Sequence, residues 1–165
     1  MLVTGGVGAI GAAVVRRLLG DPDWEVRVSD QREVPGWMRE GAAVHAGDLR
    51  DPAEAQRAVS GCTHAIHLGV AEGSGPFTES RVLVSLVQAA ADEGVERFVY
   101  VSSDEVLAGE LITRAAHEEL GLPYTICRVF DSADIKDIAD GIVTAMADPS
   151  ALNGDFDVAA PDGSD

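Results

Sequence analysis

A glycine-rich stretch near the N-terminus has the residue types that bind a diphosphate. The sequence TGGVGAIG, residues 4–11, lies between an apolar strand, expected at residues 1–4, and an amphipathic helix. One glycine of such a turn permits a positive φ, a second lets the backbone approach a phosphate, and Gly11 lets the helix pack closely on the strand. The free N–H groups and the dipole at the helix start attract an anion. We therefore predict that a pyrophosphate is held by Gly5, Gly8, Ala9, Ile10 and Gly11, the alternative being a tight structural turn.

An acidic residue follows the second expected strand, about 20 residues beyond the glycine-rich stretch. Asp30 comes directly after the strand expected at residues 25–29, where its carboxylate can accept hydrogen bonds from the ribose hydroxyls of an adenosine. It would also repel a 2′-phosphate, so we expect NAD rather than NADP, although Arg32 could admit NADP if Asp30 turned outward. We include Gln31 in this site. The alternative for Asp30 is a solvated residue that ends a strand.

Two residues after the third expected strand belong to the same predicted site. Asp48 and Leu49 follow the strand expected at residues 42–45 and could flank the adenine ring. Taken alone, Asp48 could instead cap a helix or form a turn before Pro52. The sequence thus predicts that the adenosine lies at these strand ends.

The elements that must position these residues alternate between strands and helices. Apolar runs of strand length are separated by helix-period segments, as in βαβ units around a parallel sheet that is buried on both faces. Strands are expected at residues 1–4, 25–29, 42–45, 64–68, 97–102, 123–128 and 155–158. The first helix follows the glycine-rich stretch, and later helices are expected at residues 52–59, 79–93, 110–120 and 135–147, with notable loops at 71–76 and 131–134. We predict an α/β fold in one domain, residues 1–165, with a Rossmann-type doubly wound parallel sheet in three αβα layers.

The composition argues against several classes of partner and site. The chain has 28 acidic and 12 basic residues and a formal net charge of −16, which repels nucleic acid and anionic membranes. No apolar run approaches the roughly 18 residues of a membrane span. Cys62 and Cys127 form no C-x-x-C pair, and His64 and His67 point to opposite faces of a strand, so we expect neither a metal site nor a disulfide. Because the N-terminus shows no secretion signal, we expect a cytoplasmic protein.

Over most of its length, the sequence resembles the NAD-dependent epimerase/dehydratase group of extended or atypical short-chain dehydrogenases/reductases. The matching stretches are TGGVGAIG at 4–11, GDLRD at 47–51, HLG at 67–69, EGVERFVYVSS at 93–103, GLPYTICR at 121–128 and DIADGIVTAM at 137–146. The resemblance implies a nicotinamide cofactor across the strand ends, with Leu68 and Gly69 beside it and its ring near Ser102 and Ser103. It also implies a small-molecule substrate and a homodimer that pairs the helices at 79–93 and 110–120.

The catalytic positions of this group are only partly matched in the chain. Members usually use a Ser or Thr after the fifth strand and a Tyr-x-x-x-Lys pair on the next helix, whose Tyr moves a proton while hydride passes to or from the cofactor. Ser103 matches the first position, but Glu110 and Arg114 stand where the Tyr and Lys would be. Glu110 could be a base if burial raised its pKa, or it could form a surface ion pair with Arg114. The segment SDEV at 103–106 resembles a Thr-Asp-Glu-Val segment of sugar-nucleotide dehydratases, although it is also an ordinary helix start.

The sequence leaves different functions open. The first is an NAD-binding oxidoreductase of the epimerase/dehydratase type, acting on a small hydroxyl, carbonyl or sugar substrate with a non-standard proton relay in which Ser103, Glu110 and Arg114 are the catalytic candidates. The second is a non-catalytic NAD(P)-binding regulatory or accessory protein, because the Tyr and Lys are missing, and the third is a degenerate product without a role. Residues 130–165 are expected to be a remnant of the family's C-terminal substrate lobe, which leaves few residues to enclose a nucleotide sugar.

Overall fold

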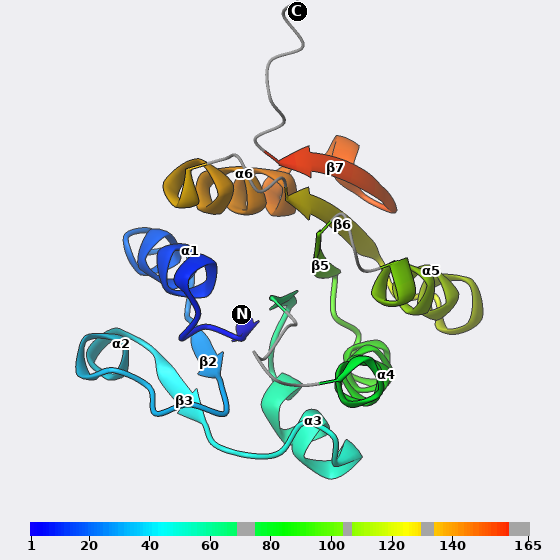
Figure 1. Ribbon diagram of the computed structural model, residues 1–165, viewed down its shortest axis with the longest axis horizontal. Coiled ribbons are helices and arrows are strands. Elements are labelled where there is room, and N and C mark those ends of the chain that lie inside the picture. The colour runs from blue at the N-terminus through cyan, green and yellow to red at the C-terminus, as the bar shows by residue number, and fades with distance from the viewer. Residues whose placement is uncertain (69–74, 104–106, 130–133, 159–165) are drawn as a thin grey trace, which may run out of the picture.

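The described residues form a seven-stranded parallel sheet in the computed structural model of the chain (Figure 1). The structure describes residues 1–68, 75–103, 107–129 and 134–158. The strands are β1 (Leu2–Thr4), β2 (Arg27–Ser29), β3 (Ala43–His45), β4 (His64–His67), β5 (Arg97–Ser103), β6 (Tyr124–Val129) and β7 (Gly154–Val158). Their order is β3-β2-β1-β4-β5-β6-β7, and every neighbouring pair is parallel. The order changes direction between β1 and β4, which confirms the predicted Rossmann-type doubly wound sheet.

Helices cover both faces of this sheet. They are α1 (Ala9–Leu19), α2 (Gly36–Gly41), α3 (Pro52–Val59), α4 (Pro76–Glu93), α5 (Leu107–Leu120) and α6 (Ile135–Ala147), with a 3-10 turn at Pro149–Ala151. On one face α1 packs against α6, whereas α3, α4 and α5 pack side by side on the other (Figure 1). The three predicted αβα layers are therefore confirmed.

Each face of the sheet carries its own apolar core, because successive strand residues point to opposite faces. Along β5, Val99 belongs to the core under α1 and α6, whereas Phe98 and Tyr100 belong to the core under α3, α4 and α5. All three side chains are at most 1% exposed. A strand buried on both faces is apolar throughout, which explains the uninterrupted run FVYV.

The element boundaries differ from the expected ones where the sequence signal is short. The helix α2 is missing from the prediction, because its six residues bury one side chain, Met38, and so show no helical periodicity. Two helices begin three residues before their expected starts, α4 at Pro76 and α5 at Leu107, and β2 begins at Arg27 rather than at residue 25. Proline is favoured at the first helical position, so Pro76 starts a helix and does not end the loop expected at 71–76. Residues 71–74 of that loop and residues 131–133 of the loop expected at 131–134 lie outside the described residues.

Two kinds of feature are absent from the described ranges. Within them, no helix combines the length and apolar character that crossing a bilayer requires. The same ranges contain no group of three or more His, Cys, Asp or Glu side chains placed to hold a metal ion. Cys62 and Cys127 are both buried thiols.

Two arginines at the amino edge of the sheet bind the carboxyl ends of two helices. Arg97 at the start of β5 is 7% exposed, and its Nη1 donates to the carbonyl oxygens of Ala145 (2.8 Å) and Asp148 (2.7 Å) at the end of α6. Arg27 at the start of β2 donates in the same way to two carbonyl oxygens at the end of α3, at 2.7 and 2.8 Å. The last carbonyl groups of a helix carry partial negative charge. The guanidinium groups therefore fix one helix to each face of the sheet.

Replacing Arg97 with Met should lower the free energy of unfolding by about 2–3 kcal/mol, because two carbonyl groups lose a charged donor. Urea unfolding followed by circular dichroism measures this loss. Arg17→Met is the matched control, since Arg17 pairs with Asp140 (3.2 Å) where both side chains are roughly half exposed. Such an exposed ion pair contributes less than about 0.5 kcal/mol to the free energy of unfolding, so its loss should hardly change stability. Equal losses in the two variants would contradict the capping role of Arg97.

Candidate functional site

The turn between β1 and α1 is built on two close backbone approaches. Gly5 has a φ of 72°, which favours glycine, and a Cβ atom there would lie 2.8 Å from the carbonyl oxygen of Leu68. A Cβ atom on Gly11 would lie 2.2 Å from the carbonyl oxygen of Gly5. The Leu68 amide also donates to the carbonyl oxygen of Thr4 (3.1 Å). The predicted cofactor residues Gly5, Gly11 and Leu68 therefore meet at the ends of β1 and β4.

This turn leaves the N-terminus of α1 open. Gly8 precedes the helix in an extended conformation, and among the described residues no side chain caps it. By contrast, the side chains of Asp51 and Asp134 cap α3 and α6. The first turn of α1 also contains no acidic residue. The amides of Ala9 and Ile10 thus lie where an anion would interact favourably with the helix dipole.

Asp30 lies against the glycine-rich turn. Its Oδ2 accepts from the Val7 amide (2.9 Å) and from Arg32 Nη2 (3.2 Å), and its Oδ1 accepts from the amide (2.9 Å) and Nε (3.1 Å) of Arg32. Burial raises the pKa of Asp30, but the hydrogen bonds from Arg32 and Val7 outweigh burial, so the pKa lies below its usual value. With 5% of its side chain exposed, Asp30 is not a solvated strand end. It also does not point outward, as the NADP alternative requires.

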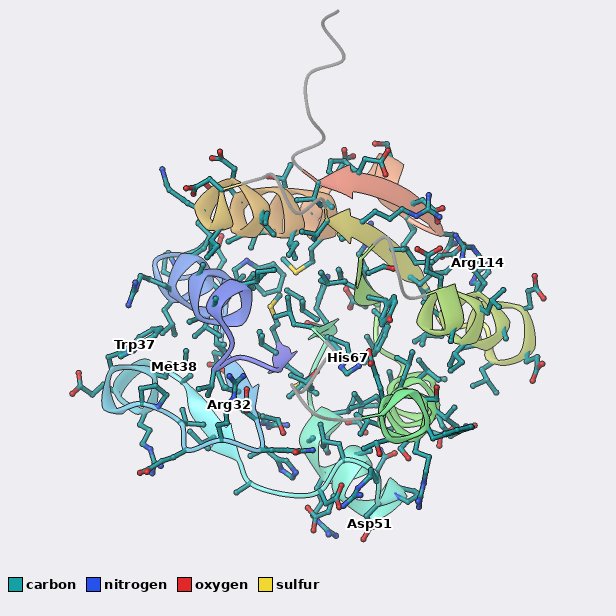
Figure 2. All side chains as sticks on the ribbon, in the orientation of Figure 1. Arg32, Trp37, Met38, Asp51, His67 and Arg114 are labelled. Atoms are coloured by element: carbon teal, nitrogen blue, oxygen red, sulfur yellow. The ribbon has the colours of Figure 1, made fainter. Side chains whose placement is uncertain are left out.

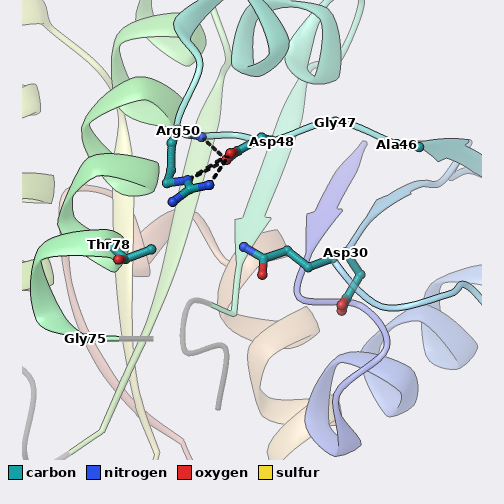
Figure 3. Close-up of a pocket in the computed structure, with 8 residues that line it drawn as sticks. Asp30, Ala46, Gly47, Asp48, Arg50, Gly75 and Thr78 are labelled. Atoms are coloured by element: carbon teal, nitrogen blue, oxygen red, sulfur yellow. Dashed lines mark hydrogen bonds and ion pairs between the residues drawn. The ribbon is translucent and has the colours of Figure 1, made fainter. Parts of the chain in front are cut away.

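A pocket of about 520 Å³ lies next to Asp30 (Figure 3). Residues that follow β2 and β3 and residues at the start of α4 line it: Asp30, Gln31, Ala46, Gly47, Asp48, Arg50, Gly75 and Thr78. The structure thus brings Gln31 and Asp48 together with Asp30. Leu49 is not among the lining residues, because its side chain packs against the core under α3, α4 and α5. The helix-capping role considered for Asp48 is wrong, since Asp51 caps α3.

Glu110 belongs to a buried ion-pair network. Its side chain is 6% exposed and accepts two hydrogen bonds from Arg128 (3.0 and 2.9 Å) and one from Arg114 (3.1 Å). The hydrogen bonds from Arg128, together with those from Ser102 and Arg114, outweigh burial and lower the pKa of Glu110 to about 2. The predicted ion pair between Glu110 and Arg114 is therefore present, although Glu110 itself is buried and not on the surface. The other interpretation is wrong: Glu110 is not a base of raised pKa, because the arginines lower its pKa.

Asp155 on β7 completes this network. Arg114 Nη2 donates to both of its carboxylate oxygens (2.7 and 2.8 Å), and Arg128 Nη2 lies 2.7 Å from its Oδ2. Two arginines and two carboxylates thus link α5, β6 and β7 without net charge. We call Glu110, Arg114, Arg128 and Asp155 the charge network. The sequence analysis missed Arg128 and Asp155, and the available signal was the arginine that interrupts the apolar strand YTICRV.

The remaining predicted residues lie at the ends of β4 and β5. Ser102 is 3% exposed and hydrogen-bonded to Glu110, and Ser103 is the last residue of β5. Gly69 and residues 104–106 of the dehydratase-like segment lie outside the described residues. His67 ends β4, where its Nδ1 is 2.6 Å from Thr4 Oγ1. Burial lowers the pKa of His67 to about 4, so its ring is neutral at pH 7.

Comparisons with known proteins find relatives over nearly the whole chain. A model of the 3-beta hydroxysteroid dehydrogenase/isomerase family matches residues 2–158. A 3 beta-hydroxysteroid dehydrogenase/Delta 5→4-isomerase of Mycobacterium tuberculosis is 29% identical over 180 residues. The match covers 95% of this chain and 48% of the relative, so the chain spans about half the length of the curated protein.

Solved structures share the fold at lower sequence identity. One is DesIV, the dTDP-glucose 4,6-dehydratase from Streptomyces venezuelae with NAD and TYD bound, which has a TM-score of 0.80 and a sequence identity of 23%. The match covers 95% of this chain and 74% of the DesIV chain. A short-chain dehydrogenase/reductase superfamily protein from Agrobacterium tumefaciens with bound NAD has a TM-score of 0.82 and a sequence identity of 20%. This match covers 96% of this chain and 77% of the chain from Agrobacterium. The UDP-glucose 4-epimerase of Thermus thermophilus in complex with NAD has a TM-score of 0.78 and a sequence identity of 20%. This match also covers 96% of this chain, and it covers 77% of the epimerase chain. At these identities the likeness shows a common fold.

The low pKa of Glu110 predicts how stability depends on pH. Its ordinary pKa is 4.5 and its pKa in the folded chain is about 2, so ionised Glu110 contributes stability above pH 4.5 that is lost as the pH falls toward 2. Glu110→Gln should therefore be less stable than the wild type by about 3 kcal/mol at neutral pH, and the difference should shrink in acid. Urea unfolding across this pH range measures it.

Glu118→Gln is the control, because Glu118 is exposed on the same helix. We expect it to differ little from the wild type at any pH. A deficit of Glu110→Gln that stays constant down to pH 2 would show that the network does not depend on the ionised carboxylate.

Proposed function

The chain belongs to the 3-beta hydroxysteroid dehydrogenase/isomerase family, and on this premise we propose that it binds NAD and transfers hydride to or from a small hydroxyl, carbonyl or sugar-like substrate. The relative from Mycobacterium tuberculosis is named for a hydroxysteroid, and two similar solved structures are named for sugar nucleotides. Both classes of compound contain a secondary alcohol that can be oxidised to a ketone. The proposed reaction is the oxidation of such an alcohol, or its reverse.

The observation that carries the proposal is the uncapped N-terminus of α1 with Asp30 beside it. The open amides supply partial positive charge for a pyrophosphate in a chain whose net charge is otherwise strongly negative. Gly5, Gly8, Ala9, Ile10 and Gly11 would hold the pyrophosphate, and Asp30 would accept hydrogen bonds from the adenosine ribose. A volume of about 520 Å³ is within the range of small-molecule pockets, so the adenine would lie there, near Gln31 and Asp48.

The nicotinamide end of the cofactor would lie beside Leu68, Gly69 and Ser102. Leu68 is held against Gly5 of the glycine-rich turn, and Ser102 lies near the end of β5. When bound, NAD supplies the hydride acceptor for an alcohol, or NADH the donor for a ketone. Parallel strands direct their carboxyl ends to one edge of the sheet, which is where ligands of such folds bind. The two ends of the cofactor would therefore lie along one edge.

The proton relay would differ from that of the family's Tyr and Lys. Ser103 would hydrogen-bond to the substrate oxygen. On oxidation the hydroxyl proton of the substrate would pass through the Ser103 hydroxyl to solvent water as hydride leaves the carbon, and the reverse reaction would take its proton back along the same path. Glu110 carries no proton at neutral pH because its pKa is about 2, so it is a poor acid and a weak base. We propose that Glu110 and Arg114 act as positioning residues, which hold the end of β5 through the hydrogen bond between Glu110 and Ser102.

Residues 130–165 would stand in the place of the family's substrate lobe, within a single domain of residues 1–165. Their described part, 134–158, forms α6, the 3-10 turn and β7. In α6, Ile138, Ile142 and Met146 are buried in the core. Since these residues complete the sheet and its covering layer, the walls around a substrate would come from outside the described part or from a second subunit.

A second subunit would bind to α4 and α5. These helices pack side by side and carry exposed apolar side chains, Val84 on α4 (52% exposed) and Leu111 on α5 (66% exposed). Burial of such side chains against a second copy would stabilise a homodimer. Sedimentation velocity should find a dimer, and Leu111→Asp should shift it toward the monomer. A wild-type chain that sediments as a monomer would contradict this part of the proposal.

Calorimetric titration with NAD tests the proposed cofactor site. Ala9→Glu places a carboxylate in the first turn of α1, where the helix dipole stabilises the charge and the fold therefore keeps its stability. The same charge repels a pyrophosphate. We expect NAD to bind about tenfold more weakly to Ala9→Glu, with a much smaller change in the uncharged control Ala9→Gln.

Turnover measured on the same proteins tests the proposed reaction. The absorbance of reduced cofactor is followed with a panel of sugar nucleotides and hydroxysteroids. We expect turnover in the wild type and in Ala9→Gln that falls in Ala9→Glu. Binding of NAD and NADH without turnover of any substrate would favour the non-catalytic regulatory or accessory protein instead. No binding of NAD to the folded wild type would refute the proposal as a whole.

A further inference from the structure

One carboxyl group lies where the packing of α4 calls for an apolar side chain. The face of α4 that packs on the sheet carries Leu83, Leu86, Val87 and Ala90, each at most 4% exposed. Glu79 lies on the same face, four residues before Leu83, in the turn of α4 that lies nearest the carboxyl edge of the sheet. Its Oε1 is buried, and no described residue forms a hydrogen bond with it. Burying such a polar atom costs free energy, so a glutamate at this position does not serve stability.

Glu79 belongs to a group of polar side chains on one face of the sheet. His67 of β4 and Tyr100 of β5 are register partners, and their rings stack with centroids 6.0 Å apart. The Nε2 atom of His67 is also buried without a hydrogen-bond partner among the described residues. Burial raises the pKa of Tyr100, and the charges of Glu79 and Glu110 raise it further. We call Glu79, His67 and Tyr100 the buried polar cluster; Figure 2 shows His67 on the side of the sheet that faces α4.

No charged group in the described part of the chain offsets the burial of Glu79. Burial alone raises its pKa above the ordinary 4.5 of a glutamate. The buried side chains of α3 are apolar, those of β4 and β5 at this end are the neutral His67 and Tyr100, and Glu110 of α5 is paired within the charge network. Glu79 therefore titrates closer to neutral pH than Glu110, whose pKa is about 2. A carboxyl group of this kind exchanges protons more readily at neutral pH.

The buried polar cluster lies next to the proposed nicotinamide end of the cofactor. His67 directly precedes Leu68, and Tyr100 lies two residues before Ser102, on the same face of β5. Whereas His67 and Tyr100 are 4% and 1% exposed, Glu79 is only half-buried, although its Oε1 is covered. Glu79 therefore borders both the buried polar cluster and solvent.

We propose that Glu79 carries the proton of the proposed reaction between Ser103 and solvent. This inference rests on the proposed function, in which the Ser103 hydroxyl receives the proton of the substrate. On oxidation, the Glu79 carboxylate accepts that proton directly or through one water molecule, and the resulting carboxylic acid releases it to solvent. The alcohol and NAD thus give a ketone, NADH and one proton, since the electron pair leaves the carbon with the hydride. In the reverse reaction the acid form of Glu79 supplies the proton.

Turnover as a function of pH tests this inference, with a substrate of the panel that the wild type oxidises. Wild-type kcat should rise with pH as Glu79 ionises, at a pH above 4.5. Glu79→Gln takes up no proton, so its kcat should be about a hundredfold lower and should lack this rise. Its affinity for NAD, measured by calorimetry, should stay within about twofold of the wild type. Glu79→Asp keeps a carboxyl group and should recover part of kcat together with the pH dependence.

Asp92→Asn is the matched control, because Asp92 is an exposed carboxylate on the same helix. We expect its kcat and the pH dependence of its kcat to equal those of the wild type. This variant removes one negative charge from α4, as Glu79→Gln does, so it separates the effect of net charge from the effect of the buried carboxyl group.

Thermal unfolding separates a proton carrier from a structural glutamate. Glu79→Leu completes the apolar face of α4 and removes the unpartnered oxygen, so we expect its Tm to rise by about 3 °C while its turnover falls as in Glu79→Gln. A Glu79→Leu chain that loses both stability and turnover would assign Glu79 a structural role and overturn the inference.

The kinetic outcomes separate the inference from the function on which it rests. Loss of the rise of kcat with pH in Glu79→Gln, with its return in Glu79→Asp, supports the inference. Equal kcat and equal pH dependence in the wild type and Glu79→Gln overturn it and leave the proposed function intact. A wild-type chain that turns over no substrate of the panel overturns both.

Discussion

The close backbone approach of Gly5 and Gly11 is the constraint on which the rest of the proposed cofactor site depends. A Cβ atom on Gly11 would lie 2.2 Å from the Gly5 carbonyl oxygen, so α1 can begin where it does only without a side chain there. The same turn presents the Val7 amide to Asp30 and sets Gly5 against Leu68. The open N-terminus of α1, Asp30 and the end of β4 are thus brought together by a contact between two residues that have no side chains.

The arginines of this acidic chain are used for specific contacts at both edges of the sheet. The chain has 12 basic residues against 28 acidic ones, so most carboxylates have no cationic partner to themselves. At the amino edge, Arg27 and Arg97 bind the last carbonyl groups of α3 and α6. After β2 and β3, Arg32 and Arg50 neutralise the two carboxylates of the pocket. The potential around the pocket is therefore less negative than the net charge of the chain suggests, which favours an anionic cofactor.

The fold and the glycine-rich turn beside Asp30 could be predicted from the sequence because both rest on local patterns. Apolar runs of strand length that alternate with helix-period segments identify the strands. The spacing of the glycines after the first strand identifies the turn between β1 and α1. The charge network could not be predicted in this way, because Arg128 lies 18 residues from Glu110, and Asp155 lies 41 residues from Arg114. Sequence alone also leaves open the direction of the pKa shift of Glu110, since burial raises it and arginines lower it. Only the packing of α5 on β6 decides between the two.

The charge network is poorly compatible with a Tyr and Lys pair, as members of the family usually have, at the positions of Glu110 and Arg114. A tyrosine at residue 110 would leave Arg114 and Arg128 with one carboxylate, Asp155, between them. A lysine at residue 114 would break the two-pronged contact with Asp155, because a single ammonium group lacks the fork of a guanidinium. The tyrosine therefore leaves an unbalanced, partly buried charge, which is costly, whereas the lysine keeps the charge and loses hydrogen bonds. A Tyr and Lys at these two positions would therefore also require new partners for Arg128 and Asp155.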